Sequence, residues 1–207
     1  MDKSAIVLTN DSSSMFEQDK GCLLLADKPL IRHVVDAVRR YVDEVVVVAR
    51  SKEQIAAYNR LLPNDVLFVE VCDVDTALVG ALAGFDAACG KYSLLVSFDM
   101  PFVSGDVVSL LFDLCGGKAA VVPRWTDGQI ESLHSVYQKK MALETARCAV
   151  DEGALDMQAM IDRLRGVRFV STLVLQQLDP DCKTFFTVNS PLDLKKATFM
   201  LKPKRSK

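Results

Sequence analysis

The sequence lacks the features that mark membrane, secreted and nucleic-acid-binding proteins. No apolar run approaches the roughly 18 residues that a membrane span needs, and the first residues show neither the basic region nor the cleavage site of a signal peptide. The formal net charge of −2 differs from the basic balance of nucleic-acid-binding proteins. We interpret the basic residues 202–207 as a solvated end. These absences predict a cytoplasmic protein with no nucleic-acid or membrane partner.

Residues at metal-ligand or nucleophile spacing are also scarce. The six cysteines, at positions 22, 72, 89, 115, 148 and 182, are too far apart for a CxxC pair. Most have apolar neighbours, which predicts reduced thiols in the core and leaves a disulfide pair as the alternative. His33 and His134 have no second ligand-type residue at suitable spacing, and no GxSxG motif occurs. We therefore assign chemistry to neither the histidines nor the cysteines.

What the sequence does contain is an alternation of apolar strand-like runs with helical stripes. Its 207 residues are enough for one sizeable core, so we expect a single domain over residues 1–207. The strands expected in the first part are residues 5–8, 45–49, 66–71, 93–98 and 119–123, with helices at 29–42, 52–62, 77–88 and 105–114. Further along, we expect strands at 132–137, 167–174 and 185–188, and helices at 139–151, 156–164 and 192–201.

This alternation predicts an α/β protein with βαβ units and a mostly parallel sheet. Ligands of such sheets bind outside the carboxyl ends of the strands. The residues that directly follow strands are therefore the most informative ones for function.

The first expected strand is followed by a polar loop that ends in Asp19 and Lys20. A strand that delivers a loop with a lysine at its end is, in outline, a phosphate-binding arrangement. The stretch reads LTNDSSSMFEQDKGCLLLADKPLIRHV, with Pro29 at an expected helix start. It resembles LAGGxSxRMGxDKALLPLxGKPLLxHV, the N-terminal signature of the molybdenum cofactor guanylyltransferases.

The loop departs from that signature at its chemically important positions. The two glycines of the pattern fall on Asn10 and Asp11, its arginine on Ser14 or Met15, and its last loop glycine on Glu17. Asn and Asp tolerate the backbone geometry that glycine provides. The carboxylates, however, would each repel a phosphate by about 1 kcal/mol or more. This predicts a degenerate phosphate loop.

Asp99 directly follows an expected central strand, within SFDMPFV, where the family shows CDMPF. A carboxylate at this place can hold Mg²⁺ through one or two oxygens, while nucleotide phosphates complete the octahedron. The alternative is a turn-forming Asp99, because Pro101 follows closely. We favour the metal site, which makes Mg²⁺ the predicted cofactor.

Residues 76–84 resemble the family's GPLxGIxxGL segment, which implies that Gly80 lies near the nucleotide base. Gly80 and Gly84, four residues apart, are equally compatible with simple tight packing. Asp73 and Asp75 form a DxD motif, which we interpret as a decoy because Asp99 is better placed.

Two segments of the second half also match by resemblance. Residues 129–137 are similar to xxEPLxAVY, with Glu131 at the acidic position. Residues 187–194 are similar to NxNTPEDL, which implies that Asn189 lies beside the metal and the substrate phosphates. A helix cap before Pro191 is the alternative for Asn189.

The resemblance spans residues 5 to about 196. It implies a three-layer α/β/α, Rossmann-like nucleotidyltransferase fold of GT-A type, in which molybdopterin phosphate attacks GTP and pyrophosphate leaves. Catalysis would fall to Lys20 and Asp99, and metal binding to Asp99 and Asn189. The implied nucleotide-binding residues are Leu8, Thr9, Asn10, Asp11, Ser12, Lys20, Gly80 and Asp99.

Two other functions are compatible with the sequence besides guanylyl transfer to molybdopterin. The chain can be a non-catalytic scaffold, or a GTP- or CTP-dependent transferase for another phosphorylated acceptor. A homo-oligomer and a partner in molybdoenzyme maturation are both open. Every version of the enzyme requires that Lys20 and Asp99 converge on one pocket.

Overall fold

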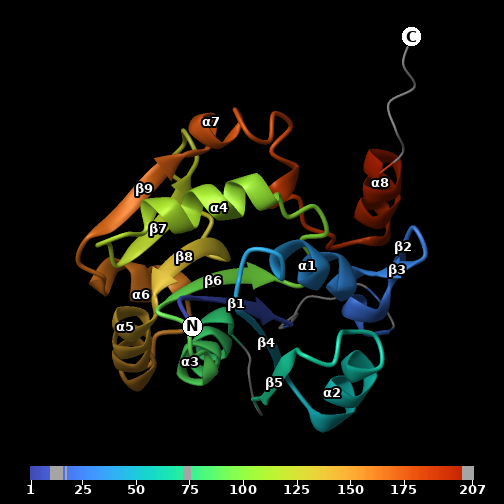
Figure 1. Cartoon of the computed structure of the whole chain (residues 1–207), viewed down its shortest axis with the longest axis horizontal. Helices are drawn as coiled ribbons and strands as arrows, with labels where there is room; N and C mark the ends of the chain where they lie inside the picture. Colours follow the sequence, from blue (N-terminus) through green and yellow to red (C-terminus); the bar gives the residue numbers. More distant parts are fainter. Residues whose placement is uncertain (10–15, 17, 72–75, 202–207) are drawn as a thin grey trace.

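The structure is a computed structural model that describes residues 1–9, 16, 18–71 and 76–201. A seven-stranded sheet runs through the molecule in the order β5-β4-β1-β6-β8-β7-β9 (Figure 1). In this sheet only β8 runs antiparallel to its neighbours, so the predicted mostly parallel sheet is confirmed. The strands are β1 (Lys3–Leu8), β4 (Glu44–Ala49), β5 (Leu67–Glu70), β6 (Tyr92–Ser97), β7 (Ala120–Arg124), β8 (His134–Gln138) and β9 (Val167–Ser171).

Helices cover both faces of the sheet, which gives the expected three layers. In Figure 1, α1 (Leu30–Val38) and α4 (Gly105–Leu114) lie above the sheet, while α3 (Ala77–Ala87), α5 (Lys139–Asp151) and α6 (Met157–Arg163) lie below it. Tyr58 of α2 (Lys52–Asn59) packs in the same apolar cluster as α1. The valines of β4 pack into the apolar clusters on both faces of the sheet. Val45 and Val47 lie in the cluster on one face, and Val46 and Val48 lie in the cluster on the other.

A small third cluster joins the β2–β3 hairpin to the last described helix. The hairpin of β2 (Leu24–Leu25) and β3 (Lys28–Pro29) packs against α8 (Pro191–Leu201) through Leu25, Val188 and Ala197. The hairpin turns through Ala26 and Asp27, which have positive φ angles of 49° and 63°. This packing brings the segment before α8 back to the loop that follows β1.

In the second half, one expected strand is confirmed but ends earlier than predicted, and another is wrong. The strand expected at 167–174 ends at Ser171, whose hydroxyl accepts a hydrogen bond from Leu173 N and starts α7 (Thr172–Leu175). The strand expected at 185–188 is the short helix η2 (Lys183–Phe185) followed by extended chain outside the sheet. The amide of Val188 donates to Asp99 O at 3.0 Å. The extended segment is therefore bound to the loop that follows β6 and does not pair with a strand of the sheet.

The prediction that most cysteines lie in the core is also wrong. Cys115 is buried, but Cys22 and Cys182 are only half-buried, and Cys89 and Cys148 are exposed. Cys148 lies on α5, whose core-facing stripe is formed by Ala142, Ala146 and Ala149 instead. These five thiols are free, whereas Cys72 lies outside the described residues.

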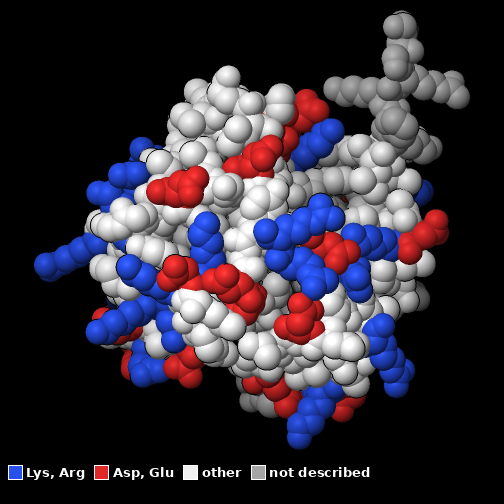
Figure 2. All heavy atoms as spheres, viewed as in Figure 1, with Lys and Arg blue, Asp and Glu red and all other residues white. Residues whose placement is uncertain are grey.

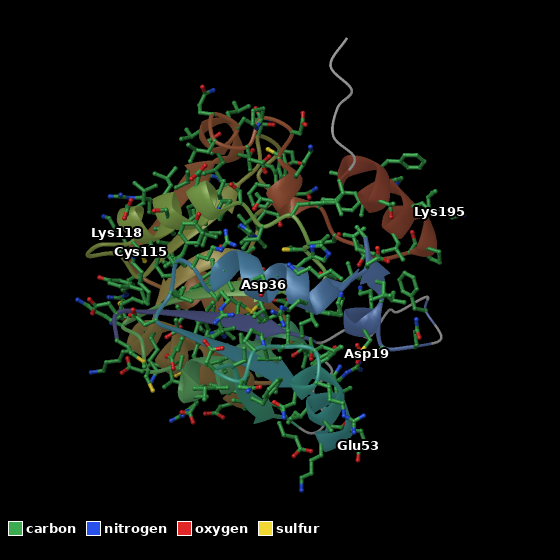
Figure 3. The ribbon with its side chains drawn as sticks, turned by 45° about the vertical axis from the view of Figure 1, so that its right-hand side comes forward. Asp19, Asp36, Glu53, Cys115, Lys118 and Lys195 are labelled. Atoms are coloured by element: carbon green, nitrogen blue, oxygen red, sulfur yellow. The ribbon has the colours of Figure 1, made fainter. Side chains whose placement is uncertain are left out.

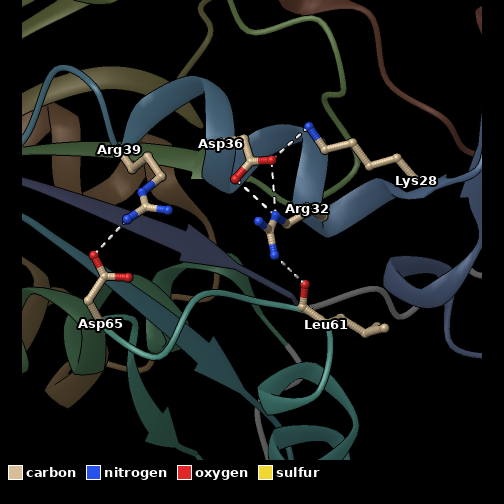
Figure 4. A network of polar contacts seen from close by, with 6 residues as sticks. All are labelled: Lys28, Arg32, Asp36, Arg39, Leu61 and Asp65. Carbon is tan, nitrogen blue, oxygen red and sulfur yellow. Dashed lines mark hydrogen bonds and ion pairs between the residues drawn. The ribbon is translucent and has the colours of Figure 1, made fainter.

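Charged side chains on the outer side of α1 form ion pairs. Asp36 lies 2.8 Å from Lys28 Nζ and 2.9 Å from Arg32 Nε, and Arg32 Nη1 also donates to Leu61 O at 2.9 Å (Figure 4). On the face in Figure 2, basic and acidic side chains are interspersed. Within the described chain, no helix is both long and apolar enough to cross a membrane.

A buried carboxylate ties the amino ends of β1 and β4 to the turn before β6. Glu44 Oε1 accepts hydrogen bonds from Ser4 Oγ and Cys89 N, both at 2.5 Å, and from Gly90 N at 3.0 Å. Replacing Glu44 by alanine removes the acceptor of Ser4 Oγ and Cys89 N, while Gly90 N keeps its hydrogen bond to Ser4 Oγ at 2.8 Å. We expect the free energy of unfolding to fall by about 3 kcal/mol. Urea denaturation measures the loss. The exposed Glu144→Ala serves as control, and equal stabilities of the two variants would contradict this role.

β8 carries a histidine that is buried in its neutral form. His134 Nε2 lies 3.0 Å from Thr184 Oγ1, and within the described ranges of the chain Nδ1 is buried without a hydrogen-bond partner. Burial lowers the pKa of His134 from 6.5 to about 4. The unfolded chain therefore takes up this proton near pH 6.5, while the folded chain resists it until about pH 4. The contribution of neutral His134 to stability is therefore fully present above about pH 6.5 and is lost as the pH falls towards about 4.

We expect wild type to lose about 2 kcal/mol more unfolding free energy between pH 7.5 and pH 5.0 than His134→Gln does. Urea titrations at both pH values measure this difference in slope. The pKa of His33 is also lowered, chiefly by burial, so His33→Gln is the matched control and should retain the His134 contribution. Parallel slopes for wild type and His134→Gln would show that His134 does not titrate in this way.

Candidate active site

The site is built where strands β4, β1 and β6 end side by side. β1 pairs in parallel with both neighbours, and Leu8 at its end is in register with Ser97 of β6 and Val48 of β4. The segments that follow these strands therefore leave from one edge of the sheet. They carry Thr9, Arg50 and Asp99 to the same rim.

Lys20 is held by a network around the residue before it. Asp19 Oδ1 accepts hydrogen bonds from Gly21 N at 2.8 Å and from Tyr58 Oη at 2.6 Å, which starts the short helix η1 (Lys20–Cys22). Asp19 Oδ2 accepts from Gln54 Nε2 at 2.6 Å, and Figure 3 shows Asp19 beside α2. Burial, and then the charge of Asp19, raise the pKa of Tyr58, so its phenol stays a donor. This network fixes Lys20 against α2.

Gly21 permits this close approach of η1 to α2. A Cβ atom on Gly21 would lie 2.4 Å from Tyr58 Oη, inside the contact distance of real atoms. The glycine that follows Lys20 therefore has a packing role at the site.

Lys20 and Asp99 lie side by side, as the prediction of an enzyme requires. Lys20 Nζ lies 2.8 Å from Asp99 Oδ2, and the two side chains are only 2% and 10% exposed. Asn189 Oδ1 accepts from the same ammonium at 3.3 Å, so three segments distant in sequence meet here. The other carboxylate oxygen, Asp99 Oδ1, is buried and has no hydrogen-bond partner among the described residues. A buried anionic oxygen without a partner is costly unless a ligand supplies one.

These groups fit a hard divalent cation that also contacts a ligand. Asp99 Oδ1 and the amide oxygen of Asn189 are oxygen donors of the kind that Mg²⁺ prefers. Among the described residues, no group of three or more His, Cys, Asp and Glu side chains can form a complete metal site. A cation held here therefore needs further oxygens from water or substrate, as Mg²⁺ does at phosphate-transfer sites.

A pocket of about 210 Å³ lies beside the ion pair. It has two cations in its wall, Lys20 and Arg50, while the oxygens of Asp19 are already occupied by donors. Its described lining comprises Thr9, Phe16, Gln18, Asp19, Lys20, Arg50, Gln54 and Phe98. The ammonium of Lys20 and the guanidinium of Arg50 are groups that can bind an anionic ligand such as a phosphate chain.

Arg50, Gln54 and Tyr58 are site residues that the sequence analysis did not predict. Arg50 directly follows β4 and so carried the same signal as Asp99, a polar residue at a strand end. Gln54 and Tyr58 lie one turn apart on α2, and only the tertiary contact with Asp19 reveals their role.

The other predicted nucleotide-binding residues lie at the end of β1, outside the described residues, or in α3. Leu8 is buried at the end of β1, and Thr9 lines the pocket with its hydroxyl donating to Val48 O at 2.7 Å. Asn10, Asp11 and Ser12 lie outside the described residues, as do Asp73 and Asp75. Gly80 is buried in α3, where its amide bonds to Thr76 O at 3.3 Å.

Gly84 and Glu131 have structural contacts. A Cβ on Gly84 would lie 2.3 Å from Ile6 Cγ2, so α3 needs this glycine to pack on β1. Glu131 Oε1 accepts a hydrogen bond from Trp125 Nε1 at 2.6 Å.

Comparison with known proteins assigns a family to this geometry. Residues 5–167, which include both Lys20 and Asp99, match the family described as MobA-like NTP transferase domain. The chain belongs to this family. It is 30% identical over 198 residues to the probable molybdenum cofactor guanylyltransferase of Methanosarcina mazei, covering 93% of this chain and 88% of the relative. Nucleotidyltransfer is therefore the activity class of the chain.

Two further relatives agree with this membership. The molybdenum cofactor guanylyltransferase of Desulfosudis oleivorans is 28% identical over 207 residues, covering 98% of this chain and 97% of the relative. The crystal structure of molybdopterin-guanine dinucleotide biosynthesis protein A from Archaeoglobus fulgidus superposes with a TM-score of 0.79 at 22% identity. That match covers 95% of this chain and 97% of the other, and it confirms the predicted nucleotidyltransferase fold.

Proposed function

We propose that the chain transfers GMP from GTP to the phosphate of molybdopterin and releases pyrophosphate, with Mg²⁺ held at Asp99 and Asn189. The observation that carries this proposal is the buried Lys20–Asp99 pair at the strand ends, with Asp99 Oδ1 left for a ligand. The names of the relatives supply the nucleotide and the acceptor.

The reaction needs position and charge neutralisation more than covalent help. An acceptor phosphate oxygen forms a bond to the α-phosphorus of GTP, the bond from that phosphorus to the bridging oxygen breaks, and pyrophosphate leaves with the electron pair. The acceptor phosphate is already ionised, so no side chain has to remove a proton. Bound Mg²⁺ would supply positive charge to the phosphate oxygens.

The chain's own residues hold and neutralise the phosphates. Lys20 is fixed through Asp19 and α2, and its ammonium is buried, where a charge–charge interaction is much stronger than in water. Arg50 adds a second cation to the pocket wall. Phe16 and Phe98 provide apolar wall that limits the access of water.

A thermal-shift panel of the four nucleoside triphosphates with Mg²⁺ tests nucleotide recognition. A ligand at 100 times its Kd stabilises the native state by about 2.7 kcal/mol, which corresponds to a Tm increase of about 5–10 °C for a chain of this size. We expect this shift with GTP and Mg²⁺ only. A comparable shift with CTP alone would overturn the guanylyl assignment, and no shift with any triphosphate would favour a scaffold protein.

A further inference from the structure

A second hollow lies on the same rim of the sheet, at the ends of β7 and β9. β7 and β9 run in the same direction as β6, because β8 is antiparallel to both β6 and β7. The ends of β7 and β9 therefore face the same way as Asp99. The hollow has a volume of about 380 Å³ and is lined by Arg124, Trp125, Thr126, Gly128, Phe169 and Ser171. None of these residues lines the pocket beside Lys20.

Two aromatic rings and a guanidinium form its walls. The guanidinium of Arg124 lies 4.8 Å from the centre of the Phe169 ring, across the parallel pair of β7 and β9. The indole of Trp125 donates to Glu131 Oε1 at 2.6 Å and meets the Phe185 ring edge-on at 5.5 Å. Each ring thus has a partner within the fold.

The loop that carries Trp125 is closed by its own hydrogen bonds. Trp125 N donates to Gln129 O at 2.8 Å, and Gly128 N donates to Trp125 O at 3.0 Å. Gly128 has a φ of 93°, a conformation that side chains rarely allow. Asp127 Oδ1 accepts from Gln129 N at 3.0 Å and so completes the turn. The loop is ordered before any ligand arrives, which lowers the cost of binding.

The chemistry of the lining selects for a flat ring. It offers one cation, two aromatic surfaces and the hydroxyls of Thr126 and Ser171, and no carboxylate is among the described lining residues. The carboxylate of nearby Glu131 is engaged by the indole. Aromatic faces favour stacking, and a guanidinium favours carbonyl and ring-nitrogen acceptors at a ring edge.

The hollow lies within one short segment of the Lys20–Asp99 pair. Phe185 contacts Trp125, and Asn189, four residues later, accepts from Lys20. Four residues of extended chain span at most about 14 Å. The hollow and the Lys20–Asp99 pair are therefore connected by one short segment of chain.

We infer that this hollow binds the pterin ring system of the phosphate acceptor, an inference that rests on the proposed guanylyl transfer for the identity of the acceptor. Arg124 and Trp125 are then specificity-determining residues at the end of the acceptor that does not react. The phosphate end is held separately, at Lys20.

The chain has a single tryptophan, so its fluorescence reports on this hollow directly. We titrate the full chain with pterin-6-carboxylate, which has no phosphate, and correct for inner-filter effects with N-acetyltryptophanamide. Saturable quenching is expected in wild type and in the surface variant Lys140→Ala. In Arg124→Ala the Kd should rise at least about tenfold, and in the matched surface variant Arg147→Ala it should stay within about twofold of wild type.

Phe169→Leu is the second variant, because it removes the ring under the guanidinium while it keeps the charge. Its Kd should also rise, and its KM for the acceptor should rise while its KM for GTP stays constant. Absence of saturable quenching in wild type, or an unchanged Kd in both Arg124→Ala and Phe169→Leu, would overturn the inference. Guanylyl transfer with normal acceptor KM in both variants would reject this hollow but keep the proposed function. Arg124-dependent pterin binding without any guanylyl transfer would keep the hollow and reject the proposed function.

Discussion

Replacing Lys20 by alanine is expected to lower kcat for guanylyl transfer by about 10²- to 10³-fold, the cost of removing one preorganised donor at developing charge. The donor is effective because its ammonium is almost fully buried and fixed through the Asp19 network. Steady-state pyrophosphate release measures kcat. Lys140→Ala, an exposed lysine on α5, is the matched control and should behave as wild type. A kcat for Lys20→Ala within threefold of wild type would remove Lys20 from the chemistry.

The same substitution should also destabilise the fold. It leaves the Asp99 carboxylate buried without its cation, and breaking one side of a buried pair typically costs about 3–5 kcal/mol. A double variant, Lys20→Met with Asp99→Leu, separates stability from catalysis. It removes both charges, so we expect stability to recover and turnover to remain lost. A double variant with restored turnover would show that the pair has only a structural role.

Replacing Asp99 by asparagine should abolish the response to Mg²⁺ and lower turnover by about 10³-fold, since charge stabilisation by a metal contributes several kcal/mol. Asparagine keeps the size of the side chain but removes the negative charge of the carboxylate, whose Oδ1 has no hydrogen-bond partner in the described part of the chain. Mn²⁺ binding followed by electron paramagnetic resonance reports the metal without requiring turnover. We expect binding in the presence of GTP in wild type and none in Asp99→Asn.

Asp113→Asn, an exposed carboxylate on α4, is the control for this experiment and should keep both Mn²⁺ binding and turnover. Wild-type Mn²⁺ affinity in Asp99→Asn would place the metal elsewhere. It would also return Asp99 to the turn-forming role that its neighbour Pro101 allows.

The site was predictable from sequence where a residue type coincided with a strand end. Lys20 closes the loop after β1 and Asp99 follows β6, and polar residues at these places point to the ligand-binding rim of a parallel sheet. The sequence did not reveal that β1 and β6 are neighbours, because strand order depends on how the crossovers pack. The family resemblance supplied that step.

Other parts of the site were not predictable because they are made by tertiary contacts. Tyr58 looks like an ordinary core residue of α2, and only the fold brings its hydroxyl to Asp19. Residues 185–188 have the composition of a strand, but the Val188 amide bonds to the end of β6. The hollow at Arg124 joins β7 to β9 across more than forty residues of sequence.

The loop substitutions at Asn10, Asp11 and Glu17 lie outside the described residues, and their effect on triphosphate binding stays a prediction.

Transfer of isotope from GTP tests the central claim most directly. The full chain is incubated with Mg²⁺, molybdopterin and GTP labelled with ³²P at either the α or the γ position, and the products are separated. If the Lys20–Asp99 pocket directs attack on the α-phosphorus, α label appears in the acceptor and γ label appears in pyrophosphate, and both transfers disappear in Asp99→Asn. Label from the γ position in the acceptor, or no label in the acceptor from either GTP, would contradict the account.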